Sequence, residues 1–156
     1  MTTRLLFVCL GNICRSPTAE AIARQRLPGD AFAQIDSAGT SNWHIGSPPD
    51  PRSIAAGAAK GYDLTPLRGR QIIAADFHRF DHIIGMDASN MDDLRSLQPP
   101  GSRAQLHLLR DFGTGAKGQD VSDPYYGSDG FDEVITLLED AMGGIAATLQ
   151  YRRAAE

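Results

Sequence analysis

The most constraining feature of the sequence is an apolar run that ends in a cysteine and is followed at once by a short polar loop. Leu5 to Val8 form the run, and the nine residues from Cys9 to Pro17 read CLGNICRSP. A continuous apolar run of this length is typical of a buried strand in a parallel sheet. The residues after Pro17 have helical spacing. This strand, loop and helix order places loop amides and a helix N-terminus around one point, where an anion binds favourably.

Two side chains in this loop have chemistry suited to a phosphoryl group. Helix N-termini and nearby guanidinium groups favour the thiolate form of a cysteine, which is its nucleophilic form. We therefore expect Cys9 to be ionised at neutral pH. The Arg15 guanidinium presents a planar fork of donors that matches two phosphoryl oxygens, which a lysine cannot do. Cys9 is thus a candidate nucleophile, and Arg15 a candidate for binding phosphate and stabilising the transition state.

The other loop residues are predicted to shape the anion site. Gly11 and Asn12 adopt positive φ more readily than other residue types, which a loop with converging amides needs. Ser16 is placed to cap the following helix, with Pro17 at its first position, and its hydroxyl could also donate to the Cys9 thiolate. The predicted phosphate-binding loop comprises Leu10, Gly11, Asn12, Ile13, Cys14 and Ser16.

Cys14 has two possible roles. It is either a small buried apolar residue beneath the loop or a partner that traps oxidised Cys9 as a disulfide and protects it from over-oxidation. The two cysteines are the only ones in the chain and stand too near in sequence to brace a fold. Such cysteine usage is typical of a cytosolic protein with chemically used thiols.

Length and charge narrow the class of protein. The 156 residues fit one domain, 1–156, with a proper core. The net charge of −4 argues against a broad surface for nucleic acid or anionic membrane. The first apolar run is too short for a signal peptide or a membrane span, so we expect a cytoplasmic protein.

Strand-like and helix-like segments alternate along the chain. The strands are expected at residues 4–9, 34–38, 81–86 and 105–109, and the helices at 17–27, 51–61 with Asp50 as cap, 88–97 and 131–149. Residues 111–130 are rich in Gly and Asp and predict a long functional loop. Residues 152–156 are expected to be a frayed tail. The alternation predicts a single three-layer α/β domain with about four parallel strands flanked by helices.

An acid is required if a thiolate is to displace a phosphate ester, because the leaving oxygen needs a proton. Asp123 is the best candidate. Pro124 biases it towards an extended conformation, and the aromatic residues that follow create a partly desolvated setting that favours a neutral carboxyl. An isolated Asp-Pro pair is more often only a turn.

The CLGNICRSP loop and the Asp-Pro-Tyr segment together resemble the signatures of the low-molecular-weight protein tyrosine phosphatases. The resemblance implies a two-step hydrolysis through a phosphocysteine, with Cys9 as nucleophile, Arg15 holding the phosphate and Asp123 as acid and then base. It implies no metal or cofactor, and inorganic phosphate as product. The implied partners are phosphotyrosine-containing proteins, with a tyrosine kinase as a further candidate, and neither nucleic acid nor membrane.

The resemblance also suggests supporting residues. Trp43 and Tyr125 resemble aromatic residues that flank a deep slot for an aryl phosphate, and Tyr126 is a third candidate. Ser37 resembles a residue that braces the loop, as does Asn12, although ordinary turn polarity explains Ser37 equally well. Asp87, just past the third predicted strand, either orients Arg15 or caps the next helix.

One position departs from the family pattern. Many members carry a histidine in the bracing network where this chain has Leu67. Because Leu67 cannot donate a hydrogen bond, we expect the support of the loop to differ here.

Three other functions fit parts of the pattern. An arsenate reductase on the same scaffold relays a disulfide through downstream cysteines, and none follows Cys14, so it would need an external thiol. A phosphocysteine carrier has no need of an acid such as Asp123. An inactive phosphotyrosine-binding module is the weakest alternative, because no catalytic position is missing.

Overall fold

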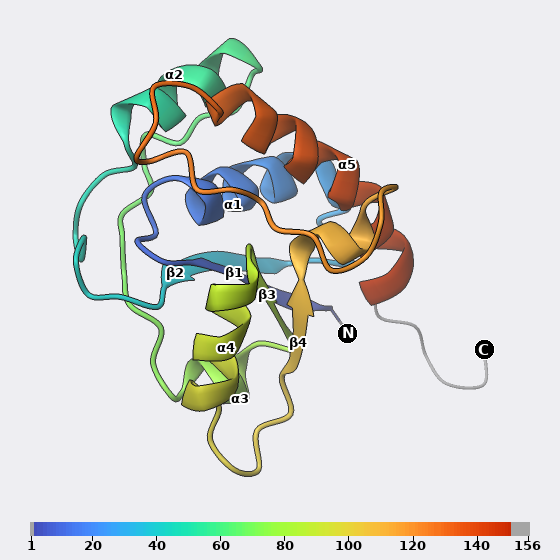
Figure 1. Ribbon diagram of the computed structural model, residues 1–156. Helices are drawn as coiled ribbons and strands as arrows, with labels where there is room; N and C mark the ends of the chain where they lie inside the picture. The colour runs from blue at the N-terminus through green and yellow to red at the C-terminus, as the bar shows by residue number, and fades with distance from the viewer. Residues whose placement is uncertain (1, 151–156) are drawn as a thin grey trace.

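Four parallel strands form the central layer of the computed structural model, which describes residues 2–150 (Figure 1). They are β1 (Arg4–Cys9), β2 (Gln34–Gly39), β3 (His82–Gly85) and β4 (Gln105–Leu108). Their order in the sheet is β2-β1-β3-β4, and all three pairings are parallel. Each strand ends within one residue of its predicted bounds, so the predicted α/β architecture is confirmed. The predicted frayed tail lies outside the described residues.

Helices cover both faces of the sheet (Figure 1). One side carries α1 (Arg15–Arg26), α2 (Pro51–Ala59) and α5 (Phe131–Leu149), and the other carries α3 (Asp76–Arg79) and α4 (Ala88–Leu97). The 3-10 turn η1 (Leu109–Phe112) follows β4 directly. The single-turn helix α3 was not predicted, because four residues are too few to show helical periodicity. No helix within residues 2–150 combines the length and apolar character needed to cross a bilayer.

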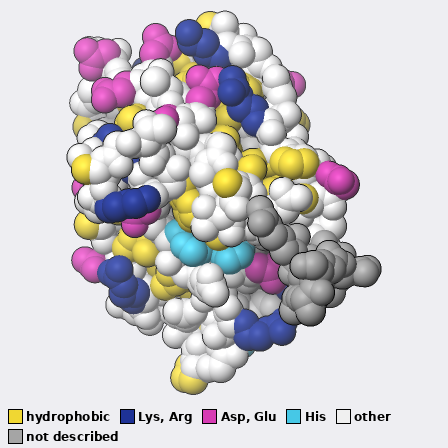
Figure 2. Space-filling model, turned by 90° about the vertical axis from the view of Figure 1, so that its right-hand side faces the viewer, with side chains coloured by type: hydrophobic (Ala, Val, Ile, Leu, Met, Phe, Trp, Pro, Cys, Tyr) yellow, Lys and Arg dark blue, Asp and Glu magenta, His cyan; other side chains and the backbone are white. Residues whose placement is uncertain are grey.

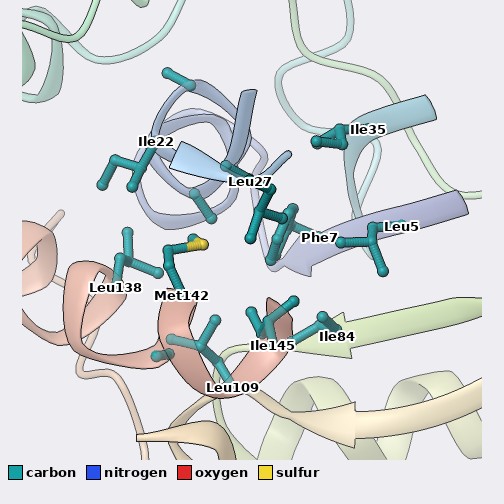
Figure 3. Packing of buried hydrophobic residues seen from close by; sticks show 14 of the residues in the cluster. Leu5, Phe7, Ile22, Leu27, Ile35, Ile84, Leu109, Leu138, Met142 and Ile145 are labelled. Carbon is teal, nitrogen blue, oxygen red and sulfur yellow. The ribbon is translucent and has the colours of Figure 1, made fainter. Parts of the chain in front are cut away.

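The core has two parts because β1 is buried on both faces. Leu5 and Phe7 belong to the cluster beneath α1 and α5, whereas Leu6 and Val8 belong to the cluster on the side of α3 and α4. Figure 3 shows Phe7 on β1 between α1 and α5, with Met142 of α5 nearby. Fully burying a side chain of this kind contributes roughly 1.5–3 kcal/mol. This alternation explains why β1 is apolar at each position from Leu5 to Val8.

Two of the helices start at aspartates. The Asp50 carboxylate accepts a hydrogen bond from the Arg52 amide at 2.8 Å and caps α2 with Pro51 at its first position, as predicted. The Asp87 carboxylate accepts from the Asn90 amide at 2.7 Å and caps α4. Each cap contributes roughly 0.5–2 kcal/mol.

A histidine pair joins β3 to β4. His82 Nδ1 lies 2.9 Å from His107 Nε2, and the histidine side chains gather in one place on the face shown in Figure 2. Burial lowers the pKa of both imidazoles, and it lowers the pKa of His107 to about 4. Both rings are therefore neutral at pH 7 in the folded protein.

Candidate active site

The predicted phosphate-binding loop lies at the carboxyl-terminal edge of the sheet, between β1 and α1. In open parallel sheets this edge is where ligands bind. Asn12 has the predicted positive φ, at 57°. Gly11 does not have a positive φ, contrary to prediction. A Cβ at Gly11 would instead come within 3.1 Å of His44 Cδ2, so close packing explains this glycine.

Cys9 is buried at the bottom of the loop, with 2% of its surface exposed. The Asn12 amide N–H donates to Cys9 Sγ at 3.3 Å, and Ser16 Oγ lies 3.0 Å from the same sulfur. The prediction that Ser16 caps the helix is wrong. Helix α1 begins at Arg15, two residues earlier than expected, so Ser16 is already inside it and has no capping hydrogen bond. Its predicted contact with the cysteine is present.

Arg15 is almost completely buried and is held by three oxygens. Its Nη1 donates to Asp87 Oδ2 at 2.7 Å and to the Val121 carbonyl at 2.8 Å, and its Nη2 lies 3.5 Å from Asp123 Oδ2. Burial opposes the positive charge, but Cys9 and the two carboxylates outweigh it and raise the pKa of Arg15. Asp87 thus makes the contacts of both alternatives expected for it, because it accepts a hydrogen bond from Arg15 and also caps α4.

The loop opens into a pocket of about 160 Å³. Cys9, Arg15 and Asp123 line it together with the three predicted aromatic residues, Trp43, Tyr125 and Tyr126; the other lining residues are Leu10, Gly11, Ile13, Cys14 and His44. The rings of Tyr125 and Tyr126 meet edge to face with centroids 5.0 Å apart. The structure therefore brings the predicted catalytic and slot residues to one place.

Two residues near the pocket were not among those predicted from the sequence. His44 lies with its ring centroid 6.1 Å from that of Tyr125, and its position next to Trp43 was the available signal. Arg52 of α2 donates to the backbone carbonyls of Tyr125 and Gly127 at 3.0 and 2.7 Å. Because Arg52 also pairs with Asp50, it holds the segment that carries Asp123 against α2.

Beneath the loop, Ser37 and Asn12, the two residues expected to brace it, are in contact with each other. Asn12 Nδ2 donates to Ser37 Oγ at 3.0 Å, and Ser37 Oγ donates to Glu20 Oε1 at 2.7 Å. Glu20 was not predicted, because an acid on a helix reads as a surface residue, yet only 3% of its surface is exposed. Leu67 packs partly buried against the apolar cluster between the sheet and α5, as expected of a side chain without a hydrogen-bonding group.

Cys14 is buried against Ile13 and Phe131, and both cysteines are free thiols. Burial raises the pKa of Cys14 to about 12, so its thiol is neutral at physiological pH. This environment is the one expected for the first of its two predicted roles. The protective disulfide with Cys9 stays a prediction. Among residues 2–150, no three His, Cys, Asp or Glu side chains come together to hold a metal ion.

A buried cysteine under a loop of amides, with an arginine and a carboxyl group beside it, defines the class of α/β domains with a phosphate-binding cysteine loop. The family model described as low molecular weight phosphotyrosine protein phosphatase matches residues 4–155. The chain therefore belongs to the low-molecular-weight phosphotyrosine protein phosphatase family.

Similar proteins agree with this assignment. Low molecular weight phosphotyrosine protein phosphatase 1 from Drosophila melanogaster is 43% identical over 97% of this chain and 98% of its own. A protein tyrosine phosphatase structure from Entamoeba histolytica is 38% identical, with a TM-score of 0.86 over 95% of this chain and 97% of that one. A Drosophila arginine phosphatase structure is 29% identical, with a TM-score of 0.84 over 97% of this chain and 100% of that one.

Proposed function

We propose that this protein hydrolyses phosphotyrosine monoesters in proteins, with Cys9 as nucleophile. The observation that carries the proposal is that Cys9, Arg15 and Asp123 line a single pocket at the carboxyl edge of the sheet. Helix α1 begins at Arg15, so its N-terminus adds a positive potential at the same point. The thiol, the cation and the acid are the three groups that a phosphocysteine mechanism needs.

In the first step Cys9 Sγ attacks phosphorus in line with the leaving oxygen. The S–P bond forms as the P–O bond to the substrate breaks, and the Asp123 carboxyl gives its proton to the departing phenolate. Arg15 and the loop amides carry the charge of the equatorial oxygens. The fixed contacts of Arg15 with Asp87 and Val121 position it before substrate arrives.

In the second step the Asp123 carboxylate takes a proton from water as the water oxygen attacks phosphorus. The S–P bond breaks, and the electron pair returns to Cys9 as a thiolate. Ser16 Oγ, 3.0 Å from the sulfur, is placed to hydrogen-bond this leaving group. The products are inorganic phosphate and the starting enzyme.

The walls of the pocket favour an aryl phosphate. Trp43 and Tyr126 are 64% and 78% exposed at the rim, and Tyr125 stands between Tyr126 and His44. Flat rings stack on such walls, whereas the shorter phosphoserine side chain would not reach Cys9 at the bottom. Ile13 adds an apolar wall that offers no acceptor to a phosphoarginine guanidinium. Phosphotyrosine-containing proteins are therefore the proposed partners, including a tyrosine kinase as one candidate, and the free thiols favour a cytoplasmic location.

The test is hydrolysis of para-nitrophenyl phosphate from about pH 4 to 8 in the presence of EDTA. We expect turnover by the wild type, none by Cys9→Ser, and a loss of roughly 10²–10⁴-fold in Asp123→Ala. Phosphoserine and phosphoarginine serve as substrate controls and should be turned over poorly.

A folded, reduced and inactive wild type would overturn the proposal. A phosphocysteine that forms but does not hydrolyse would favour a carrier, and arsenate reduction with added thiol would favour a reductase. The family assignment favours neither alternative.

A further inference from the structure

A continuous chain of buried side chains connects the catalytic thiol to a carboxylate on the far side of the loop. Ser16 Oγ lies 3.0 Å from Cys9 Sγ, Asn12 Nδ2 donates to Ser16 Oγ at 2.8 Å and to Ser37 Oγ at 3.0 Å, and Ser37 Oγ contacts Glu20 Oε1 at 2.7 Å. All five residues are at most 5% exposed. We call this set, Cys9, Ser16, Asn12, Ser37 and Glu20, the Glu20 chain.

The directions of the hydrogen bonds in the Glu20 chain follow from a backbone donor at Asn12 and from the carboxylate of Glu20. The Arg70 backbone N–H donates to Asn12 Oδ1 at 2.9 Å, so Asn12 must point both hydrogens of its Nδ2 at the two serines. Each serine oxygen then accepts one hydrogen and has its own to place. A carboxylate can only accept, so the Ser37 hydrogen goes to Glu20.

The Ser16 hydroxyl has two acceptors for its hydrogen. Cys9 Sγ lies at 3.0 Å, whereas the Ala38 carbonyl lies at 3.4 Å, which is long for a hydrogen bond between oxygens. The hydrogen is therefore directed at the sulfur. A thiolate that receives an O–H bond is a better-stabilised nucleophile in the first step and a better leaving group in the second.

We propose that Glu20 is a positioning residue: its carboxylate accepts the Ser37 hydrogen, so that Ser37 Oγ can accept from Asn12 and hold the Asn12 amide where its other hydrogen meets Ser16 Oγ beside Cys9 Sγ. This inference rests on Cys9 being the nucleophile of the proposed function. Glu20 touches neither the phosphate site nor Cys9, and it acts only through Ser37, Asn12 and Ser16.

The surroundings of Glu20 keep this arrangement in place. Arg24, one turn along α1, donates from Nε to Glu20 Oε2 at 2.9 Å, with its Nη2 at the same distance. Asp36 of β2 also acts on Glu20 and raises its pKa, and Asp36 is itself paired with Arg70 at 3.0 Å. Burial raises the pKa of Glu20, and the hydrogen bonds from Ser37 and Arg24 oppose that rise. Arg24 thus supplies the countercharge that the buried Glu20 carboxylate needs. Leu67, which stands where many family members have a histidine, carries no charge.

The isosteric variant Glu20→Gln tests the direction of the bonds without removing volume. Arg24 would hold the amide oxygen of the glutamine, so the amide nitrogen would face Ser37. Ser37 Oγ would then meet two donors, from residue 20 and from Asn12, and its own hydrogen would have no acceptor. This conflict would push Asn12 away from Ser37 and loosen its bond to Ser16.

The experiment measures the rate at which iodoacetamide alkylates Cys9 as a function of pH, which requires no substrate. In Glu20→Gln we expect the midpoint of the rate–pH profile to move up by about one pH unit. Alkylation at low pH should then be about tenfold slower than in the wild type. We also expect kcat for an aryl phosphate to fall about tenfold with KM unchanged. The matched control is Glu139→Gln, which breaks the exposed Arg26 pair and leaves the Glu20 chain intact.

A second pair of variants separates the direction of the bonds from general damage to the fold. Ser37→Ala removes the link between Glu20 and Asn12 but keeps the bonds from Asn12 to Ser16 and from Ser16 to Cys9. Adding Glu20→Gln to Ser37→Ala should therefore change the alkylation profile less than twofold. An equal effect of Glu20→Gln with and without Ser37, or an unchanged profile in the single variant, would overturn the inference.

A measurement on the wild type does not depend on how the variants fold. The ¹³C NMR signal of the Glu20 carboxyl group should be that of an ionised group at about pH 7, and a protonated group at that pH would overturn the inference. The outcome is separate from that of the proposed function. A shifted alkylation profile in a protein that hydrolyses no aryl phosphate would leave the Glu20 chain standing and remove the phosphatase activity.

Discussion

Asp87 and Arg15 lie 72 positions apart in the chain and meet at 2.7 Å between Asp87 Oδ2 and Arg15 Nη1. The other carboxylate oxygen, Oδ1, accepts from the Asn90 amide and caps α4. One carboxylate therefore fixes the Arg15 guanidinium, which we propose binds the phosphate, to the start of a helix on the opposite face of the sheet. The guanidinium does not have to be ordered when substrate binds, so less of the binding energy is lost.

The first prediction concerns Asp87→Asn. Asparagine is also a good N-cap, so the melting temperature should change little. The charge-assisted bond to Arg15 is lost, and kcat/KM for an aryl phosphate should fall roughly 10–100-fold. The control is Asp120→Asn, whose carboxylate accepts from the Ala88 amide at the start of the same helix and does not contact Arg15. Equal losses in the two variants would contradict the role given to Asp87.

The second prediction concerns the leaving group. If Asp123 protonates the departing oxygen, Asp123→Asn should lose more activity on phosphotyrosine, whose phenolate leaves poorly, than on para-nitrophenyl phosphate, whose phenolate leaves well. The measurement is kcat/KM for a series of aryl phosphates of increasing phenol pKa in both proteins. A constant ratio across the series would exclude Asp123 as the acid.

The third prediction compares two adjacent glycines of α5. A Cβ at Gly144 would lie 2.0 Å from the Phe112 carbonyl oxygen, whereas a Cβ at Gly143 would have no heavy atom within 4 Å. Gly144→Ala should therefore lower the free energy of unfolding by about 1–3 kcal/mol, because α5 must move away from η1. Gly143→Ala should raise it by about 0.5–1 kcal/mol, because alanine favours a helix. Urea unfolding of both variants is the test, and stabilisation by both would contradict the close packing.

The fourth prediction concerns stability in acid. The folded-state pKa of His107 is lowered from 6.5 to about 4, so the unfolded chain binds more protons between these values. The free energy of unfolding should therefore fall with pH from about 6.5 to 4, by at most about 3 kcal/mol from this residue. In His107→Gln this part of the fall should disappear, whereas in the control His78→Gln, at an exposed position of α3, it should remain. If the free energy of unfolding depended on pH in the same way in the wild type and in His107→Gln, the lowered pKa of His107 would be contradicted.

The strands and the long helices were predictable because their signals are local. Consecutive apolar residues predict the buried strand β1, and apolar residues at helical spacing predict the buried face of α5. The structure confirms both. The start of α1 was less predictable. Pro17 signals a first helical turn, but the helix already begins at Arg15. Ser16 therefore lies inside the helix and contacts Cys9 instead of capping the helix.

The supporting residues could not be predicted from the sequence, because the residues that they contact are distant along the chain. Glu20 reads as a solvent-facing acid, and only the approach of β2 brings Ser37 within 2.7 Å of it. Arg52 reads as a surface cation, and only the return of the chain 73 positions later places the Tyr125 carbonyl beside it. The residues proposed as catalytic could be singled out because their side-chain types are chemically informative, and the structure places them in one pocket, whereas supporting residues are identified only by their contacts.

The most direct test of the account is to quench the enzyme in acid during turnover of an aryl phosphate and to map the phosphorylated residue by mass spectrometry. The account predicts one phosphoryl group, on Cys9 and not on Cys14, which accumulates in Asp123→Ala when a good leaving group is supplied. Turnover with phosphate on another residue, or with no phosphoenzyme formed at a competent rate, would contradict the phosphocysteine mechanism.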